Sequence, residues 1–314
     1  MDHRNHSPVT NFIFEPLIEV PILNIFFFLL VLTMYLMTML GNFFIIMVTF
    51  TSSVLQSPMY FFLQNLSFLE IGYTSTIIPK MLSNLLLEDM SISFIGCATQ
   101  MYFFSSLGIA ECCLLTAMSY DRYVAICQPL HYSAIMNRTS CLKMSIFCWI
   151  IGVMVVLVPI ALIFTLPFCG PNKINHFFCD LPPLLRLACT DTYKNEIIIF
   201  TITVVFIMLP FLLILISYIH IFHAILRMSS TTSRSKAFST CSSHIMVVTL
   251  FYGSAVLTYL RPKSISSVKA DKALSIFYTV VCPMMNPLIY SLRNQEMKDS
   301  LKKLIGIKIL LSRM

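Results

Sequence analysis

The chain has 314 residues, of which 57% are hydrophobic and 11% charged, and its mean hydropathy is +0.82. A soluble domain carries about 25% charged residues, so this composition excludes one. The net charge is +7, but a chain this apolar is expected to meet membrane lipid rather than nucleic acid.

Apolar segments of membrane-spanning length recur seven times. About 20 helical residues cross the hydrocarbon layer, and the segments must be helical because lipid offers the backbone no hydrogen-bond partners. We therefore predict an all-α membrane protein with a seven-transmembrane helix bundle, in one domain over residues 1–314. The segments are Ile22–Phe50, Met59–Ile78, Ala98–Ala117, Leu142–Leu166, Ile197–Ile219, Ile245–Leu260 and Ala273–Leu292.

The loop charges predict the orientation. Twelve Lys and Arg residues fall on the side of the C-terminal tail and nine on the other side, whereas the acids number three and nine. We expect residues 1–21 to be extracellular, 22–292 to form the bundle and 293–314 to be cytoplasmic. The first segment is longer than the 7–15 residues of a signal-peptide core, so it is expected to remain as the first helix.

Cysteines and a sequon fit this orientation. Four of the eleven cysteines, Cys97, Cys169, Cys179 and Cys189, fall on the outer side, where disulfides persist. Four cysteines allow three pairings, and the spacing alone does not choose among them. Asn5 begins the glycosylation sequon Asn5-His-Ser7 on the same side.

The triplet Asp121-Arg122-Tyr123 stands where the third apolar segment gives way to a basic loop. Ionised side chains are costly in a bilayer unless they are paired or wet. The triplet is therefore either a pair of ordinary interfacial charges or a latch that holds the helix end and can be released.

Glu70 and Glu111 are the acids that lie deep within spans. Buried carboxylates pair, bind a cation or take up a proton. A shared cation site is one interpretation, and the alternative is a protonated Glu bonded to a backbone carbonyl.

Two tyrosines lie at the predicted depth of Arg122. Tyr218 ends the fifth segment, and Tyr290 follows Asn286 and Pro287 in the seventh, where Pro287 predicts a bend. These phenols and the guanidinium could form alternative hydrogen-bond sets, as a two-state switch requires. The other interpretation is that tyrosine simply favours membrane interfaces.

Motifs from the first helix to the tail resemble the rhodopsin-like G-protein-coupled receptors and, within them, the land-vertebrate class of odorant receptors. Two departures are Ser119 in place of the usual Ala and Glu70 in place of the usual Asp. The matching motifs are Gly41-Asn42, Pro58-Met-Tyr-Phe-Phe-Leu63, Leu66-Ser67, Met118-Ser-Tyr-Asp-Arg-Tyr-Val-Ala-Ile-Cys127, Ser217-Tyr218, Lys236-Ala-Phe-Ser-Thr-Cys-Ser-Ser-His244, Phe251-Tyr-Gly253 and Pro283-Met-Met-Asn-Pro-Leu-Ile-Tyr-Ser-Leu-Arg-Asn294.

The resemblance implies two disulfides, Cys97 with Cys179 and Cys169 with Cys189. It implies a sodium ion held by Glu70 and Glu111, with a geometry that the longer Glu70 puts in question, and no other cofactor. We also expect a short amphipathic helix after the seventh segment.

The resemblance also places a small neutral ligand between the third, fifth and sixth helices, under the second outer loop. Helical phase from Arg122 selects the inward-facing residues of the third helix. With residues of the fifth and sixth helices they form an apolar cleft with a few hydroxyls. The predicted ligand-binding residues are Met101, Phe104, Ser105, Gly108, Ile202, Phe206, Tyr252, Ala255, Val256 and Tyr259.

The implied function is that of an odorant receptor, not an enzyme, in the plasma membrane of olfactory neuron cilia. On ligand binding, Arg122 would leave Asp121 for Tyr218 and open a site for a stimulatory, olfactory-type G protein that raises cyclic AMP. The alternative is a transporter or channel, which the intramembrane acids allow but for which we find no inverted repeat. An intramembrane hydrolase is disfavoured, because no acid completes a metal set with the histidines.

Overall fold

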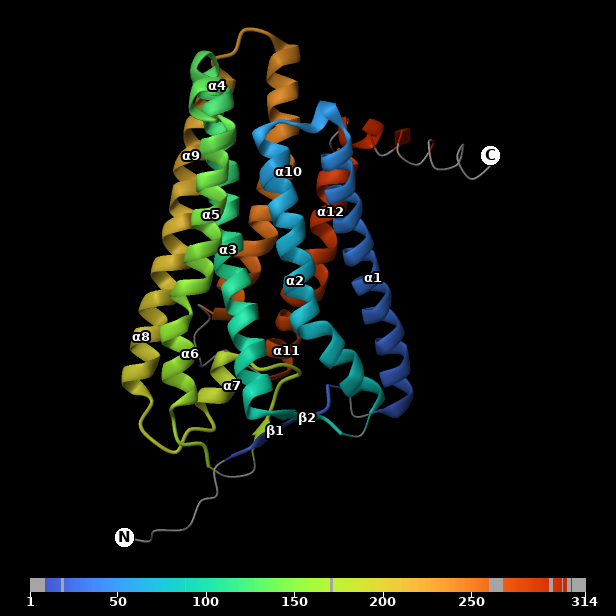
Figure 1. The fold of residues 1–314 in the computed structure, drawn as a ribbon, viewed down its shortest axis with the longest axis vertical. Helices are drawn as coiled ribbons and strands as arrows, with labels where there is room; N and C mark the ends of the chain where they lie inside the picture. The colour runs from blue at the N-terminus through green and yellow to red at the C-terminus, as the bar shows by residue number, and fades with distance from the viewer. Residues whose placement is uncertain are drawn as a thin grey trace.

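The computed structural model describes residues 9–17, 20–87, 89–169, 172–259, 268–293, 296–300, 302–303 and 306. Long helices run side by side between two ends of the molecule (Figure 1). Their bounds are α1 Pro21–Thr51, α2 Pro58–Leu86, α3 Phe94–Cys127, α5 Arg138–Val155 with α6 Leu157–Phe164, α8 Tyr193–Thr203 with α9 Leu209–Leu226, α10 Thr231–Tyr259, and α11 Val268–Ile276 with α12 Cys282–Arg293.

In this described part, six helical stretches are long and apolar enough to cross a membrane. The remaining long helix, α2, has 29 residues, about 43 Å at 1.5 Å per residue, and it packs between α1 and α3. The predicted seven-helix membrane bundle is therefore confirmed.

Helix α3 is the central element, because it packs against α2, α5 and α9. Its start is capped by Ser93, whose side chain accepts from the Gly96 amide. Helix α5 starts in the same way, with Asn137 accepting from the Ser140 amide at 2.9 Å. Side-chain oxygens at these positions satisfy amides that have no partner within the helix.

Two helices extend past their predicted ends. Helix α2, predicted as Met59–Ile78, continues through Pro79 to Leu86; membrane helices tolerate proline because neighbouring groups compensate for the lost bond. Helix α3 continues to Cys127, so Arg122 lies within its last turns rather than at the start of a loop.

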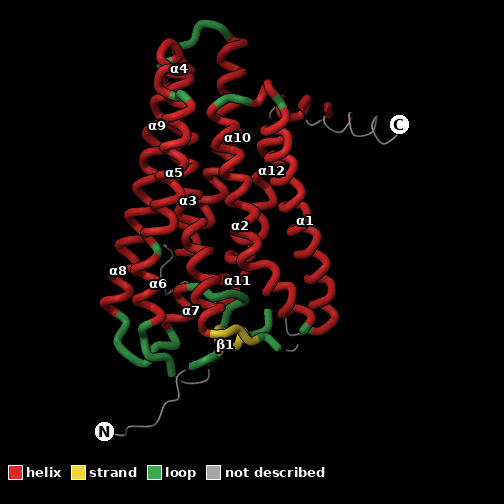
Figure 2. The backbone as a smooth tube through the Cα atoms, in the orientation of Figure 1, coloured by secondary structure: helices red, strands yellow, loops and turns green. Residues whose placement is uncertain are grey.

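A three-stranded sheet, which the sequence did not predict, covers the outer end (Figure 2). Strand β1 Asn11–Phe14 lies between β2 Ser91–Ser93, to which it is antiparallel, and β3 Lys173–Ile174, to which it is parallel. Residues alternate in burial along β1, and Phe12 and Phe14 point inward with 0% and 2% of their surface exposed. The N-terminal segment is thereby fastened over the bundle.

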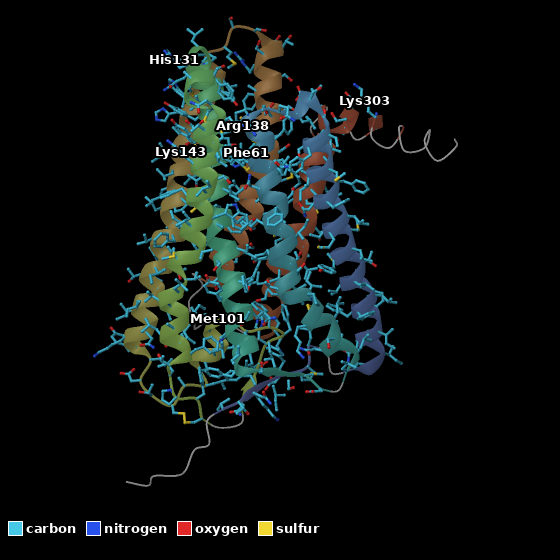
Figure 3. All side chains as sticks on the ribbon, in the orientation of Figure 1. Phe61, Met101, His131, Arg138, Lys143 and Lys303 are labelled. Atoms are coloured by element: carbon cyan, nitrogen blue, oxygen red, sulfur yellow. A yellow bond between two sulfur atoms is a disulfide. The ribbon has the colours of Figure 1, made fainter. Side chains whose placement is uncertain are left out.

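The opposite end carries the short elements η2 Pro129–His131 and α4 Tyr132–Ile135. His131, Arg138, Lys143 and Lys303 lie toward this end, far from Met101 (Figure 3). The described part of the chain after α12 includes a helical stretch at 296–300. Glu296 there accepts a hydrogen bond from the Tyr60 hydroxyl at 2.8 Å, which ties this stretch to α2.

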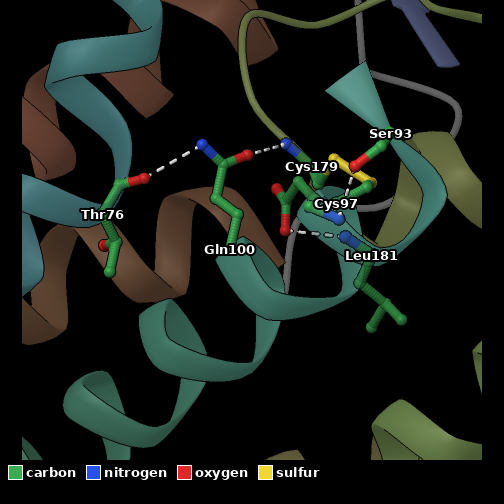
Figure 4. The surroundings of a disulfide bond; sticks show 8 residues. Thr76, Ser93, Cys97, Gln100, Cys179 and Leu181 are labelled. Carbon is green, nitrogen blue, oxygen red and sulfur yellow. Dashed lines mark hydrogen bonds between the residues drawn. A yellow bond between two sulfur atoms is a disulfide. The ribbon is translucent and has the colours of Figure 1, made fainter. Parts of the chain in front are cut away.

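Two disulfides close the outer loops in the pairing that the resemblance implied. Cys97, in the first turn of α3, is bonded to Cys179, and Cys169 is bonded to Cys189. The first of these holds the long loop between α6 and α8 against the top of α3 (Figure 4). Asn5 lies outside the described residues.

Candidate functional site

A cavity of about 160 Å³ lies inside the outer half of the bundle. It is bordered by α2, α3, α6, α8, α10 and α12 and by the segment that follows Cys179. Its wall is mostly apolar, with a few hydroxyls and carboxylates. A cavity of about 150 Å³ lined by aliphatic and aromatic side chains can hold a molecule the size of benzene, so this one suits a small apolar ligand.

Most of the residues predicted for a ligand site are brought together here. The third helix contributes its whole predicted face, and single residues come from the two other helices. The predicted residues that line the cavity are Met101, Phe104, Ser105, Gly108, Ile202 and Ala255.

Three of the predicted residues lie elsewhere. Phe206 belongs to the π-helical turn η3 Val204–Met208, whose wider turn breaks the 3.6-residue phase and presents Ile207 to the cavity instead. Tyr252 is buried against Phe211, at a ring distance of 4.9 Å, and Val256 is 39% exposed. The side chain of Tyr259 lies outside the described residues.

Some of the cavity residues that the sequence reasoning missed come from elements outside the three predicted helices. Tyr73 lies on α2, and Tyr278 lies in the π-helical turn η5 Phe277–Val281. Asp180 and Leu181 come from the outer loop, which the Cys97–Cys179 disulfide brings to the bundle. The implied disulfide was the one sequence signal that could have pointed to the last two.

The two intramembrane acids border the inner end of this cavity. Glu70 and Glu111 are 1% and 2% exposed, and their carboxyl groups lie close enough to interact. The Asn286 amide donates to one oxygen of Glu70, while the other oxygen is buried with no further partner in the hydrogen-bond network. Two adjacent carboxylates hold a proton or a cation between them, so these residues fit a monovalent cation.

Helices α1 and α12 meet close to this site. A side chain at Gly41 would bring its Cβ within 2.9 Å of Cβ of Pro287. Glycine at this position therefore permits the approach that keeps Asn286, one residue before Pro287, beside Glu70.

At the other end of α3 the charged triplet forms an ion pair. The Arg122 Nε donates to Oδ2 of Asp121 at 3.0 Å, and the Tyr132 hydroxyl donates to Oδ1 at 2.8 Å. Asp121 is fully buried, so both of its oxygens depend on these partners. Tyr123 points away from the pair and packs against Tyr120 and His220.

Tyr218 does not meet Arg122 in this structure. Its hydroxyl bonds Nδ1 of His244 at 2.7 Å, and Nε2 of His244 bonds the Leu115 carbonyl at 3.1 Å. These two bonds join α10 to α9 and α3. Tyr290 is buried, and its hydroxyl has no partner among the described residues.

The sequence reasoning did not include His244 among the residues of the switch. It ends the Lys236–His244 motif and is fully buried. A buried neutral histidine requires partners for its nitrogens, and this requirement was the available signal. Its partners could be named only once the helices were packed.

Comparisons with known proteins agree with this architecture. A family model described as olfactory receptor matches residues 31–308. Human olfactory receptor 10A7 is 54% identical over 98% of this chain and 97% of its own length. Human olfactory receptor 10A4 is 56% identical over 88% of each chain, and mouse olfactory receptor 5AR1 is 49% identical over 98% of this chain and 99% of its own.

Proposed function

The chain belongs to the olfactory receptor family, and we propose that it detects a small, mostly apolar volatile ligand in the cavity beside α3. The size and apolar wall of the cavity support this ligand class. Met101, Phe104 and Ile202 provide apolar contact, and Ser105 provides a hydroxyl that fixes the orientation of a polar group.

We propose that the structure represents the closed state of a two-state switch. In this state Arg122 is paired with Asp121, and His244 connects α10 to Tyr218 and to the Leu115 carbonyl. A ligand that contacts Phe251 and Ala255 on α10 would favour a position in which the inner end of α10 has moved outward. It can do so only by binding that state more tightly.

In the open state Arg122 would meet Tyr218, and a cytosolic cleft would receive a stimulatory, olfactory-type G-protein α-subunit, raising cyclic AMP. Asn286, Pro287 and Tyr290 would allow the inner end of α12 to adjust. The basic residues near this end, among them Arg138, Lys143 and Lys303, would attract both the anionic inner leaflet and the G protein.

The plasma membrane, and in olfactory tissue the ciliary membrane, is the proposed location, with Asn5 glycosylated outside. Glu70 and Glu111 would hold a sodium ion in the closed state, supplying the positive charge that two buried carboxylates require. Asn286, which donates to Glu70, would orient that carboxylate.

One observation carries the proposal: the bundle has a small apolar cavity toward its outer end, and the Asp121–Arg122 pair and the His244 hydrogen bonds lie toward the inner ends of α3 and α10. The test is odorant-dependent cyclic AMP in cells that express the chain. Arg122→Ala should abolish the response while surface expression is kept. Ser105→Ala should change the ranking of odorants, whereas Ser242→Ala, distant from the cavity, should not. An undiminished response of Arg122→Ala would refute the switch.

A further inference from the structure

A second and larger cavity, of about 680 Å³, lies outside the first. The long outer loop, the short helix α7 Leu181–Leu185, α8, the outer end of α10 and α11 border it. Tyr193, at its rim, is 66% exposed, so the cavity is in contact with the extracellular solvent. The mechanism proposed above gives this cavity no role.

The two cavities share a wall. Asp180, Leu181, Ile199 and Thr203 line both of them, so a single layer of side chains separates the cavities. Ile199 is 5% exposed and Asp180 is 6% exposed, so these two side chains of the wall are packed. Side-chain rotations occur within nanoseconds where packing allows them, and rotation of Leu181 would connect the two spaces.

One edge of the wall is fixed to the bundle. The backbone amide of Cys179 donates to Oε1 of Gln100 at 2.9 Å, and Nε2 of Gln100 donates to the Thr76 carbonyl at 3.0 Å (Figure 4). Together with the Cys97–Cys179 disulfide, these bonds set the position of the residue before Asp180. The wall therefore cannot retreat as a whole, and a ligand must pass between its side chains.

The polar group of the wall is a hydrogen-bond acceptor. Asp180 accepts from the Leu181 amide at 2.8 Å, and a carboxylate has room for further donors. Burial raises the pKa of Asp180 to about 6, so the carboxylate remains mostly ionised at neutral pH. His176, 3% exposed, adds one ring nitrogen that has no partner among the described residues, while the other bonds Ser275.

We propose that the outer cavity is a second subsite, which binds the hydrogen-bond-donating head of an elongated amphiphile whose apolar chain passes between Leu181 and Ile199 into the inner cavity. This inference rests on the proposed function and specifies the ligand class: medium-chain alcohols. The inner cavity alone accommodates only about a benzene-sized group. A ligand with a longer chain must therefore keep part of its length outside the wall. An alkanoic acid is disfavoured with its head group at Asp180, because its carboxylate would face that of Asp180.

The native thiol of Cys112 allows a direct test, because it is free and lines the inner cavity. A Thr258→Cys variant adds a thiol to the outer cavity alone. Purified receptor is treated with methyl methanethiosulfonate in the presence of 1-butanol or 1-decanol, and the labelling of each cysteine is followed by mass spectrometry. Cys127, in the last turn of α3, serves as the unprotected control.

We expect 1-decanol to slow the labelling of both thiols at least fivefold with the same concentration dependence, and 1-butanol to protect Cys112 alone. Leu181→Trp, which fills the wall, should remove protection of Cys112 by 1-decanol. In Asp180→Asn, which can still accept from the Leu181 amide, 1-decanol should protect the two thiols no better than decyl methyl ether does. The inference would be overturned if 1-decanol did not protect the thiol of Thr258→Cys. It would also be overturned if 1-butanol and 1-decanol protected that thiol equally.

This measurement needs no G protein. Protection of both thiols without any cyclic AMP response would refute the proposed function and leave the subsite in place. A cyclic AMP response to short odorants without protection at Thr258→Cys would refute the subsite and leave the proposed function in place.

Discussion

Replacing His244 with leucine should raise signalling in the absence of ligand. His244 forms two buried side-chain hydrogen bonds between α10 and its neighbours, to Tyr218 at 2.7 Å and to the Leu115 carbonyl at 3.1 Å. Leucine has a similar volume and no polar atom, so it removes both bonds without opening a large cavity. Tyr218, which the open state is proposed to need, is left intact.

The magnitude follows from the two bonds. A buried hydrogen bond contributes about 0.5–1.5 kcal/mol net. The Leu115 carbonyl is not left unsatisfied when His244 is replaced, because it still accepts the backbone hydrogen bond within α3. The closed state should therefore lose about 1–2 kcal/mol relative to the open state. A change of that size shifts a two-state ratio by a factor of about 5–30.

The assay is basal cyclic AMP, normalised to surface expression measured with an antibody against an N-terminal epitope. The expected result is a several-fold higher basal level with the maximal odorant response kept. Ser242→Ala is the matched control, because Ser242 lies on the same helical turn and bonds only the Ser239 carbonyl. Basal signalling that falls, or does not change, at normal surface expression would refute the assignment of His244 to the closed state.

Three further predictions concern stability. Phe12→Ala should lower the free energy of unfolding of the outer cap by about 3–5 kcal/mol, because Phe12 is fully buried. Ile13→Ala is the control and should have little effect, because Ile13 is 44% exposed. Thermal melting with a probe on the N-terminal segment would distinguish the two variants. Burial, with a smaller contribution from the Lys272 charge, lowers the pKa of His176 from 6.5 to about 3. The stability that neutral His176 provides is therefore complete above pH 6.5 and lost as the pH falls toward 3, by up to about 1.4 kcal/mol per pH unit; His176→Asn should flatten this loss, and an unchanged pH profile would contradict it. Glu70→Gln should abolish any extra stabilisation by sodium chloride over choline chloride, with Glu15→Gln as a surface control, and an undiminished sodium effect would place the ion elsewhere.

The helices could be predicted from the sequence because apolar length alone determines them. Lipid leaves the backbone no alternative to helix, so seven long apolar runs were sufficient evidence. Strand β1 could not be predicted in this way. Its four residues pair with segments about 80 and 160 positions away, and the alternation of Asn11 to Phe14 is too short a pattern to indicate a strand by itself.

The ligand cavity was predictable along α3 and less so on the other helices. Counting 3.6 residues per turn from Arg122 identified Met101, Phe104, Ser105 and Gly108, because α3 is regular throughout this interval. On the fifth helix Phe206 does not line the cavity, because the π-helical turn shifts the phase by a fraction of a turn. Asp180 and Leu181 depend on a loop fold, which no local periodicity encodes.

The arrangement of α10 connects the two functional ends. Phe251 lines the cavity, and His244 is hydrogen-bonded to Tyr218. The two residues are seven positions apart, which is about 10.5 Å along the axis and almost two full turns. The two side chains therefore lie on the same face of α10. The helix contains no proline between Thr231 and Tyr259, so the kink that proline introduces is absent here. A ligand that displaces α10 at Phe251 consequently acts on His244 through a continuous helix, and the strength of the His244 bonds sets how much differential binding energy the ligand must supply.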